Sequence, residues 1–383
     1  TTIGQICFFA SFLLLLVVFL PLIVRYFWKC EPLEPSPKVR DLEGFLRKNG
    51  FRYRGLLRWP LLGGRMMTAG IMGIVPRYRY LLITDSLLEA LTTEELEAVL
   101  AHEMGHARYR HLLFYVLFFL GFIMISFGLM DFFFILVVYL AGFPGSSGVG
   151  NGLSPTLFYL FLSVPMLGIL LVYFRYVMGF FMRHFERQAD LYSASVMGKP
   201  GPAVRALEKI AYFSGKIRDL PSWHHFSVRE RVDTLWRSLR EPGLIRSHNR
   251  FVALCFGVYL LAMLVVGTVL NFGPLNEYMT YSVAERVIED RLDEGAENLV
   301  LYQDLAMVYH HQEKYSEAVQ VYERIIEMDP DRAEALNNLA WILVTVSDEE
   351  IRDEHRGLTL AKRADQLADL GIAKTFDESS SDA

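Results

Sequence analysis

The chain has 383 residues, enough for two or three domains, and 52% of them are hydrophobic, a high share for a soluble protein. Its net charge of −5 combines two regimes: residues 1–271 carry 28 Lys and Arg against 18 Asp and Glu, whereas residues 272–383 carry 10 against 25, so we expect two environments or two domains. The three cysteines lie in or beside apolar runs and none is paired at metal-binding spacing, which argues against a cysteine zinc site and a disulfide framework.

Residues 3–28 form an almost continuous apolar run that is long enough to cross a bilayer. No basic segment precedes the run and no small-residue cleavage site follows it, so we interpret residues 1–28 as a retained membrane anchor. Basic side chains are dense from Arg25 to Arg58, and the positive-inside rule places them in the cytoplasm, with the N-terminus outside. A nucleic-acid patch is the alternative, but the adjacent span and the acidic chain disfavour it, and we expect no nucleic-acid partner.

Residues 66–91 are typical of a strand pair that ends in a turn. The stretch Tyr78–Thr84 is rich in aromatic and β-branched side chains, and Asp85 and Ser86 then interrupt it. A strand at this place could offer its edge to an extended peptide, or it could be buried within the domain. The sequence leaves both possibilities open.

A helix is indicated next by the capping-box pattern of residues 92–95 and by apolar residues that recur at helical spacing. Residues 102–106 of this helix read His-Glu-Met-Gly-His, the H-E-x-x-H pattern. Because positions i and i+4 lie on one face, His102 and His106 can bind one metal ion, and Glu103 can act as the base for a metal-bound water. So short a pattern also occurs by chance, in helices whose histidines are merely solvated or partly buried.

Three further apolar runs predict membrane helices at about residues 112–140, 157–181 and 251–272. With the anchor, they predict four spans and place both termini outside. No helix breaker separates His106 from the first of these runs, so we expect one continuous helix from the H-E-x-x-H pattern into the membrane. Asp131 in that run either lies near the far interface or is a functional intramembrane carboxylate.

A third metal ligand should come from a second helix that faces the first. The span at 157–181 leads directly into the polar helical segment 185–190, on the same side of the membrane as His102. Glu186 is well placed to be this ligand. Asp190, one turn later, can orient a ligand histidine by accepting its other N–H.

The acidic residues 273–375 differ in kind from what precedes them. A unit that begins at Leu299 has suitable residues at seven positions of a tetratricopeptide repeat. These are Tyr302, Leu305, Ala306, Tyr309, Ala318, Tyr322 and Pro330. A second unit begins near Ala333, and an unspecialised helical hairpin domain is the alternative. The acidic, Ser-rich residues 376–383 are predicted to form a disordered tail.

Three motifs in register resemble a known family. The segments His102–His106, Glu186–Asp190 and His225–Arg231 match the order and spacing of membrane zinc metallopeptidases of the CaaX-protease and HtpX type, which are gluzincins with an H-E-x-x-H…E-x-x-x-D signature. The resemblance covers roughly residues 40–240. It implies one Zn²⁺ per chain on His102, His106 and Glu186, with Glu103 as general base.

The resemblance also implies roles for residues outside the metal ligands. His225 and Arg231 would line the site and help to hold the developing charge. His225 could instead be a solvated loop residue, and Arg231 could be a structural partner of Asp190 or Glu230. His111 matches a histidine often seen just after the motif, and we interpret it as structural, at the membrane edge.

The chain departs from the family pattern at two places. Phe226 stands where the family often has Pro, and Thr68-Ala69 stands where the strand before the zinc helix often carries Asn-Ala. The second departure concerns substrate binding and leaves the metal ligands intact.

These features predict a mainly α protein with a small β element before the H-E-x-x-H helix. Its parts are an anchor (1–28), a zinc metallopeptidase domain (29–250), a fourth transmembrane helix (251–272) and a tetratricopeptide-like helical domain (273–375), followed by the tail. We expect an endopeptidase of a bacterial inner membrane that cleaves proteins or peptides in or near the bilayer, in protein quality control or processing. Its catalytic domain would face the cytoplasm. Its repeat domain would lie outside and could bind a partner protein. The alternatives are a CaaX-type processing protease and a membrane-tethered repeat scaffold with a vestigial zinc site.

Overall fold

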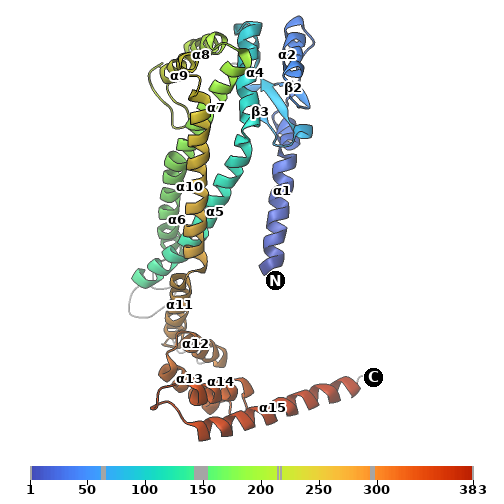
Figure 1. The fold of residues 1–383 in the computed structure, drawn as a ribbon. Coiled ribbons are helices and arrows are strands. Elements are labelled where there is room, and N and C mark those ends of the chain that lie inside the picture. The colour runs from blue at the N-terminus through green and yellow to red at the C-terminus, as the bar shows by residue number, and fades with distance from the viewer. Residues whose placement is uncertain are drawn as a thin grey trace. The chain divides into compact units, whose positions relative to one another are not determined.

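The computed structural model describes residues 2–61, 66–141, 154–213, 215, 218–293 and 298–381. The fold is mainly helical with one small sheet, which confirms the fold class predicted from the sequence (Figure 1). The chain divides into two compact units, residues 1–123 with 169–263 and residues 124–168 with 264–383. This division passes through the long apolar helices, so the domain boundaries expected from the sequence stay a prediction.

A four-stranded sheet precedes the helix that carries the H-E-x-x-H pattern. Its strands are β1 (Glu31–Pro32), β2 (Gly55–Arg58), β3 (Ala69–Met72) and β4 (Tyr80–Ile83), in the order β1-β2-β4-β3. β4 is parallel to β2 and antiparallel to β3, and all four of its residues are buried. The strand pair expected within residues 66–91 is therefore present: β4 is the buried strand and β3 lies at the edge of the sheet.

The first unit also contains shorter helices. They are α2 (Pro37–Lys48), the 3-10 turn η2 (Pro76–Tyr78), α3 (Asp85–Ala90), α4 (Thr93–Arg108), α7 (Gly179–Met197), α8 (Gly201–Phe213) and α9 (Val228–Arg240). α4 begins with the expected capping box, in which the Thr92 hydroxyl accepts from the Glu95 amide and the Glu95 carboxylate accepts from the Thr92 amide. Its apolar residues Leu96, Leu100 and Met104 are buried in the core of the unit.

α4 and α7 lie side by side in very close contact (Figure 1). Gly105 of α4 makes this possible, because a Cβ at that position would lie 2.9 Å from the Cα of Ala189 on α7. The Ser193 hydroxyl also donates a 2.7 Å hydrogen bond to the Ala98 carbonyl, which joins the two helices. The helix with the H-E-x-x-H pattern is thus fixed against the helix that carries Glu186.

Long apolar helices continue from these elements. They are α1 (Thr2–Phe27), α5 (His111–Ala141), α6 (Pro155–Val172) with the π-helical turn η3 (Tyr173–Met178) that joins it to α7, and α10 (Leu244–Phe272). Within the described residues, three stretches are long and apolar enough to cross a membrane, and a shorter apolar helix covers Leu15–Phe27. Those stretches are His111–Val137, Thr156–Met197 and Leu244–Asn271. The fourth span and the orientation of the chain stay predictions, as do both interpretations of Asp131.

The prediction of one continuous helix from His106 into the membrane is wrong. α4 ends at Arg108 and α5 begins at His111, and between them Arg110 adopts a left-handed conformation with φ of 59°. In an uninterrupted helix each residue turns by about 100°, so His111 would point about 140° away from His106. The left-handed turn instead brings Nδ1 of His111 to 2.9 Å from Nδ1 of His106, a buried contact that offsets the strain at Arg110.

The second unit contains the helical repeats. Its helices are α11 (Pro274–Asp293), α12 (Leu299–His311), α13 (Tyr315–Met328), α14 (Ala333–Thr345) and α15 (Glu354–Ser381). α12 and α13 form the hairpin expected from the repeat pattern, and its small and aromatic positions Ala306, Tyr309, Ala318 and Tyr322 are buried in one core. α14 packs on this hairpin as the first helix of the next repeat.

The last helix reaches into the predicted tail, whose disorder stays a prediction. α15 continues to Ser381, through most of residues 376–383, for which the sequence predicts disorder. No Gly or Pro follows Gly371 in the sequence, so no residue interrupts the helix there.

The close contact between α4 and α7 can be tested at Gly105. We expect Gly105→Ala to push the two helices apart and to lower the free energy of unfolding by about 1–3 kcal/mol. Gly44→Ala in α2 is the control, because a Cβ at Gly44 meets no atom within 4 Å, and this change should be neutral or slightly stabilising. Thermal unfolding of the full chain in detergent measures both effects, and equal midpoints for the two variants would contradict the close contact.

Candidate metal centre

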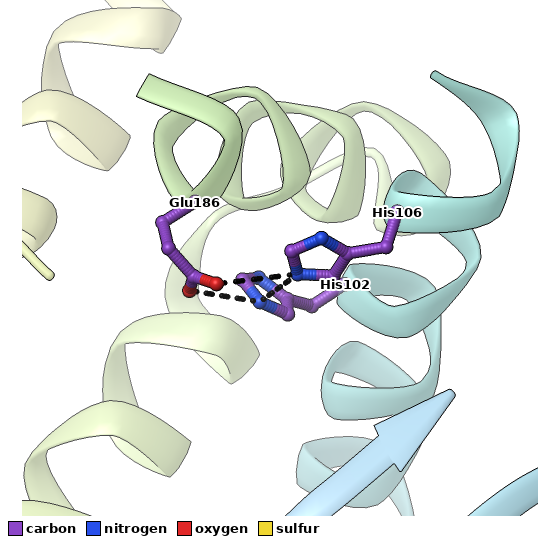
Figure 2. A group of neighbouring side chains, drawn as sticks. All are labelled: His102, His106 and Glu186. Atoms are coloured by element: carbon purple, nitrogen blue, oxygen red, sulfur yellow. Dashed lines mark hydrogen bonds and ion pairs between the residues drawn. The ribbon is translucent and has the colours of Figure 1, made fainter. Parts of the chain in front are cut away.

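Three side chains from two helices converge at one point. His102 and His106 project from the same face of α4, and Glu186 faces them from α7 (Figure 2). Nε2 of His102 lies 3.2 Å from Nε2 of His106. One carboxylate oxygen of Glu186 lies 3.4 Å from the His102 nitrogen, and the other lies 3.4 Å from the His106 nitrogen. The spacing expected of residues i and i+4 on a helix is thus combined with a third donor from a neighbouring helix.

These distances fit a tetrahedral metal ion. A zinc ion binds His nitrogen and carboxylate oxygen at about 2.0–2.1 Å, and a tetrahedron with such bonds has edges of about 3.3 Å. The two imidazole nitrogens are 3.2 Å apart, and each has one of the two Glu186 oxygens at 3.4 Å, separations close to the length of these edges. Two imidazoles and one carboxylate also form a donor set that zinc accepts, with a fourth position left for water.

Asp190 and Arg231 hold His102 in place. Nδ1 of His102 donates to the Asp190 carboxylate at 2.9 Å, which leaves Nε2 to face the metal position. Arg231 of α9 donates two hydrogen bonds of 2.7 and 2.8 Å to the same carboxylate. The structure therefore brings Asp190 to the place expected for it, and Arg231 is the partner of Asp190 that the sequence left as one of its options.

His225 also reaches the site. Its Nδ1 lies 3.1 Å from a carboxylate oxygen of Glu186, and Arg231 lies 3.7 Å from the same oxygen. Phe226, the departure from the family pattern, instead packs under the Arg187 guanidinium, 3.9 Å from its ring centroid. The loop before α9 is thus fixed against α7, with His225 directed toward the metal ligands.

A cavity of about 610 Å³ is lined by all seven of the metal-ligating, catalytic and supporting residues expected from the sequence. They are His102, Glu103, His106, Glu186, Asp190, His225 and Arg231. Thr68, Ala69, Gly70 and Ile71, at and just before β3, line one wall. Sequence reasoning missed other lining residues, which come from separate elements and have no shared motif. Examples are Trp59, Tyr115, Met182 and Ile210.

Burial and charge set the ionisation of the site. Burial raises the pKa of Glu103 to about 7 and lowers the pKa of His106 to about 4. Burial also acts to lower the pKa of His102, but hydrogen bonds and charges from Asp190 and Glu186 outweigh it and raise that pKa to about 10. Nε2 of His102 must lose its proton to bind a metal, so metal binding at this site releases a proton.

Comparisons with known proteins give two family matches. The model of peptidase family M48 matches residues 65–277, more than half of the chain, and a tetratricopeptide repeat model matches residues 299–342. No curated protein matches the sequence. Among solved structures, the crystal structure of S. mikatae Ste24p is similar, with a TM-score of 0.49 and 21% sequence identity over 60% of this chain. The match spans 57% of the length of that chain.

The donor set predicts that zinc stabilises the folded chain. A ligand that binds only the native state adds about 2.7 kcal/mol at 100 times its dissociation constant, so zinc should raise the unfolding midpoint of the chelator-treated protein and magnesium should not. His106→Ala should abolish the rise, whereas His355→Ala, which changes an exposed histidine in the first turn of α15, should retain it. A rise of equal size in His106→Ala would place the zinc effect elsewhere.

Proposed function

Because the chain belongs to peptidase family M48, we propose that it is a membrane-embedded zinc-dependent endopeptidase. The observation that carries the proposal is the convergence of His102, His106 and Glu186, whose ligand atoms lie within 4.8 Å of one another, with Glu103 in the same cavity. His102, His106 and Glu186 would hold the zinc ion, which when bound activates water and polarises the peptide carbonyl.

The residues around the proposed ligands have distinct roles in this hydrolysis. Glu103 takes a proton from the attacking water and passes it to the leaving amine. Arg231 acts through Asp190, whose carboxylate it holds against His102, and is therefore a positioning residue. His225, beside Glu186 on the wall of the cavity, is the group that we infer to hold the developing negative charge.

The edge strand β3 supports a peptide as substrate. Ala69, Gly70 and Ile71 of this strand line the cavity, and among the described residues the strand is paired with β4 on one side only. An extended chain that lies along the free edge would form main-chain hydrogen bonds and would place one of its peptide bonds near Glu103. The Ile71 backbone acts to lower the pKa of Glu103, and both residues line the same cavity, so this part of the strand lies close to the proposed base.

The position of the site favours substrates in or near the bilayer. α5 begins five residues after His106, and α7 continues without interruption from α6 through η3. One helix that could cross the membrane thus begins beside the candidate metal centre, and another contains Glu186. We propose a role in membrane-protein quality control or processing, in a bacterial inner membrane, with the repeats of the second unit binding a partner protein. Within the described residues, nothing specifically favours the CaaX-type alternative.

The role of Glu103 as the base can be tested by substitution. Glu97 provides the control position, because it lies on the same helix and is not among the cavity-lining residues. We expect Glu103→Gln to retain zinc but to lose at least about 10²-fold in the rate of cleavage of an unfolded casein substrate, because general-base catalysis contributes this much or more. Glu97→Gln should cleave like the wild type. Elemental analysis and a fluorescent casein assay measure the two quantities. If the wild type and Glu103→Gln were equally inactive while the repeats bound a partner, the scaffold alternative would be favoured.

The proposed orientation can be tested by cysteine labelling, because replacing Cys7, Cys30 and Cys255 removes every cysteine from the chain. In that background, Asp382→Cys would report on the repeat unit. Asp219→Cys would report on the catalytic part, since the Asp219 side chain is 63% exposed. A membrane-impermeant maleimide should label the first variant in intact spheroplasts and the second only after permeabilisation. The reverse pattern would place the catalytic part outside.

A further inference from the structure

His111 is a buried histidine with no role in the proposed hydrolysis. Its side chain is fully buried, and its ring stacks on Phe185 with centroids 4.3 Å apart. Nδ1 of His111 lies 2.9 Å from Nδ1 of His106, and Nε2 lies 3.1 Å from the amide oxygen of Gln188. Both ring nitrogens of this residue therefore have a polar partner, and one of these partners is a proposed metal ligand.

The hydrogen bonds continue from Gln188 to a third helix. The Gln188 side-chain amide donates a 3.0 Å hydrogen bond to the amide oxygen of Asn249 on α10. The Asn249 amide in turn donates a 3.1 Å hydrogen bond to the hydroxyl of Tyr109, in the turn between α4 and α5. The resulting chain of polar groups connects α10, α7 and this turn to the face of His106 that points away from the metal position.

The direction of these hydrogen bonds fixes where the protons lie. Gln188 presents its oxygen to His111, and an amide oxygen can only accept, so Nε2 of His111 carries the proton. A neutral imidazole has one N–H, which makes Nδ1 of His111 an acceptor. His106 must then donate from its own Nδ1. Nε2 of His106 is left as a lone pair, directed at Glu186 and His102.

We propose that His111 and Gln188 are positioning residues that hold His106 in the tautomer and ring orientation required to bind zinc, with Asn249 fixing the Gln188 amide. The inference rests on the proposed zinc site. It gives the two histidine ligands different supports, since His102 is held by the carboxylate of Asp190, whereas His106 is held by a neutral imidazole and a neutral amide.

The charge of the site explains why a neutral support is suitable at His106. The cavity already contains the carboxylates of Glu103, Glu186 and Asp190, and Arg231 pairs with the last of these. A further carboxylate behind His106 would add a buried negative charge with no cation beside it, which is costly. A neutral acceptor orients the imidazole without this cost.

A purely structural role for His111 makes a different prediction. If the residue only fills space under Phe185, then any side chain of similar shape should serve at positions 111 and 188. If it acts as a hydrogen-bond acceptor, the acceptor at each position must be kept. Three substitutions separate these cases. His111→Phe keeps an aromatic ring for the stack, Gln188→Met keeps the approximate shape, and Gln188→Glu keeps the acceptor oxygen.

The experiment measures zinc affinity of the purified full chain in detergent, by competition with a chromophoric chelator. Loss of an outer partner of a metal ligand typically weakens binding by about 10–100-fold, which is the loss expected for His111→Phe and Gln188→Met. Gln188→Glu keeps the acceptor oxygen but adds a buried charge, so its zinc affinity should lie between that of Gln188→Met and that of the wild type. The Asn249 amide can rotate so that its NH₂ group donates to the new carboxylate. The Tyr109 hydroxyl can then donate to the Asn249 amide oxygen. His310→Phe, the same change in the repeat unit, is the matched control.

The outcomes distinguish the inference from the proposed function. Wild-type affinity in His111→Phe and Gln188→Met would overturn the positioning role and leave the zinc site intact, as would an equal loss in Gln188→Glu and Gln188→Met. A wild-type chain that fails to compete for zinc would overturn the proposed function, and the inference with it. Because the two Gln188 variants are compared with each other, the conclusion holds even if His111→Phe does not fold.

Discussion

The contact between α4 and α7 at Gly105 determines whether the metal centre can form. Gly105 lies directly before His106, and Ala189 lies one turn after Glu186, so the point of closest approach is also the point where the donors meet. Metal–ligand distances tolerate errors of only about 0.2 Å, less than the displacement that a single methyl group at Gly105 would cause. The glycine in the second variable position of the H-E-x-x-H pattern thus has a structural function here: it sets the distance between the two halves of the site.

Around this contact, the chain balances charges that would be costly if buried alone. Glu103, Glu186 and Asp190 bring three carboxylates into one cavity, and within it Arg231 binds the carboxylate that does not face the metal position. Asp190 can therefore orient His102 without adding net charge. The positive charge of a bound zinc ion would be matched by Glu186 and Glu103. Arg231 therefore pairs chiefly with Asp190 while it also lies 3.7 Å from Glu186 at the wall of the cavity.

Much of this site follows from periodicity and order in the sequence. The spacing of His102 and His106 on a capped helix, and the arrival of Glu186 from a second helix, depend on local patterns, so they could be predicted. The turn at Arg110 could not, because Arg has no preference for a left-handed conformation and only the tertiary contact of His111 makes it favourable. The hydrogen bonds from Gln188 to α10 likewise join residues far apart in sequence, and no spacing rule relates them. Local sequence patterns thus predicted the candidate metal ligands. The contacts that hold these ligands in place depend on packing between helices, which the patterns do not show.

The free edge of β3 has a consequence for which chains can be cut. A transmembrane helix in lipid satisfies its own backbone hydrogen bonds, and it would have to give these up before its main chain could pair with a strand. If peptides bind along β3 as proposed, an intact membrane helix is a poor substrate whatever its side chains, and a segment that has already unwound at the bilayer surface is a good one. Selection would then depend on the loss of helical order more than on residue type, so that a folded membrane protein is spared and its damaged copy is degraded.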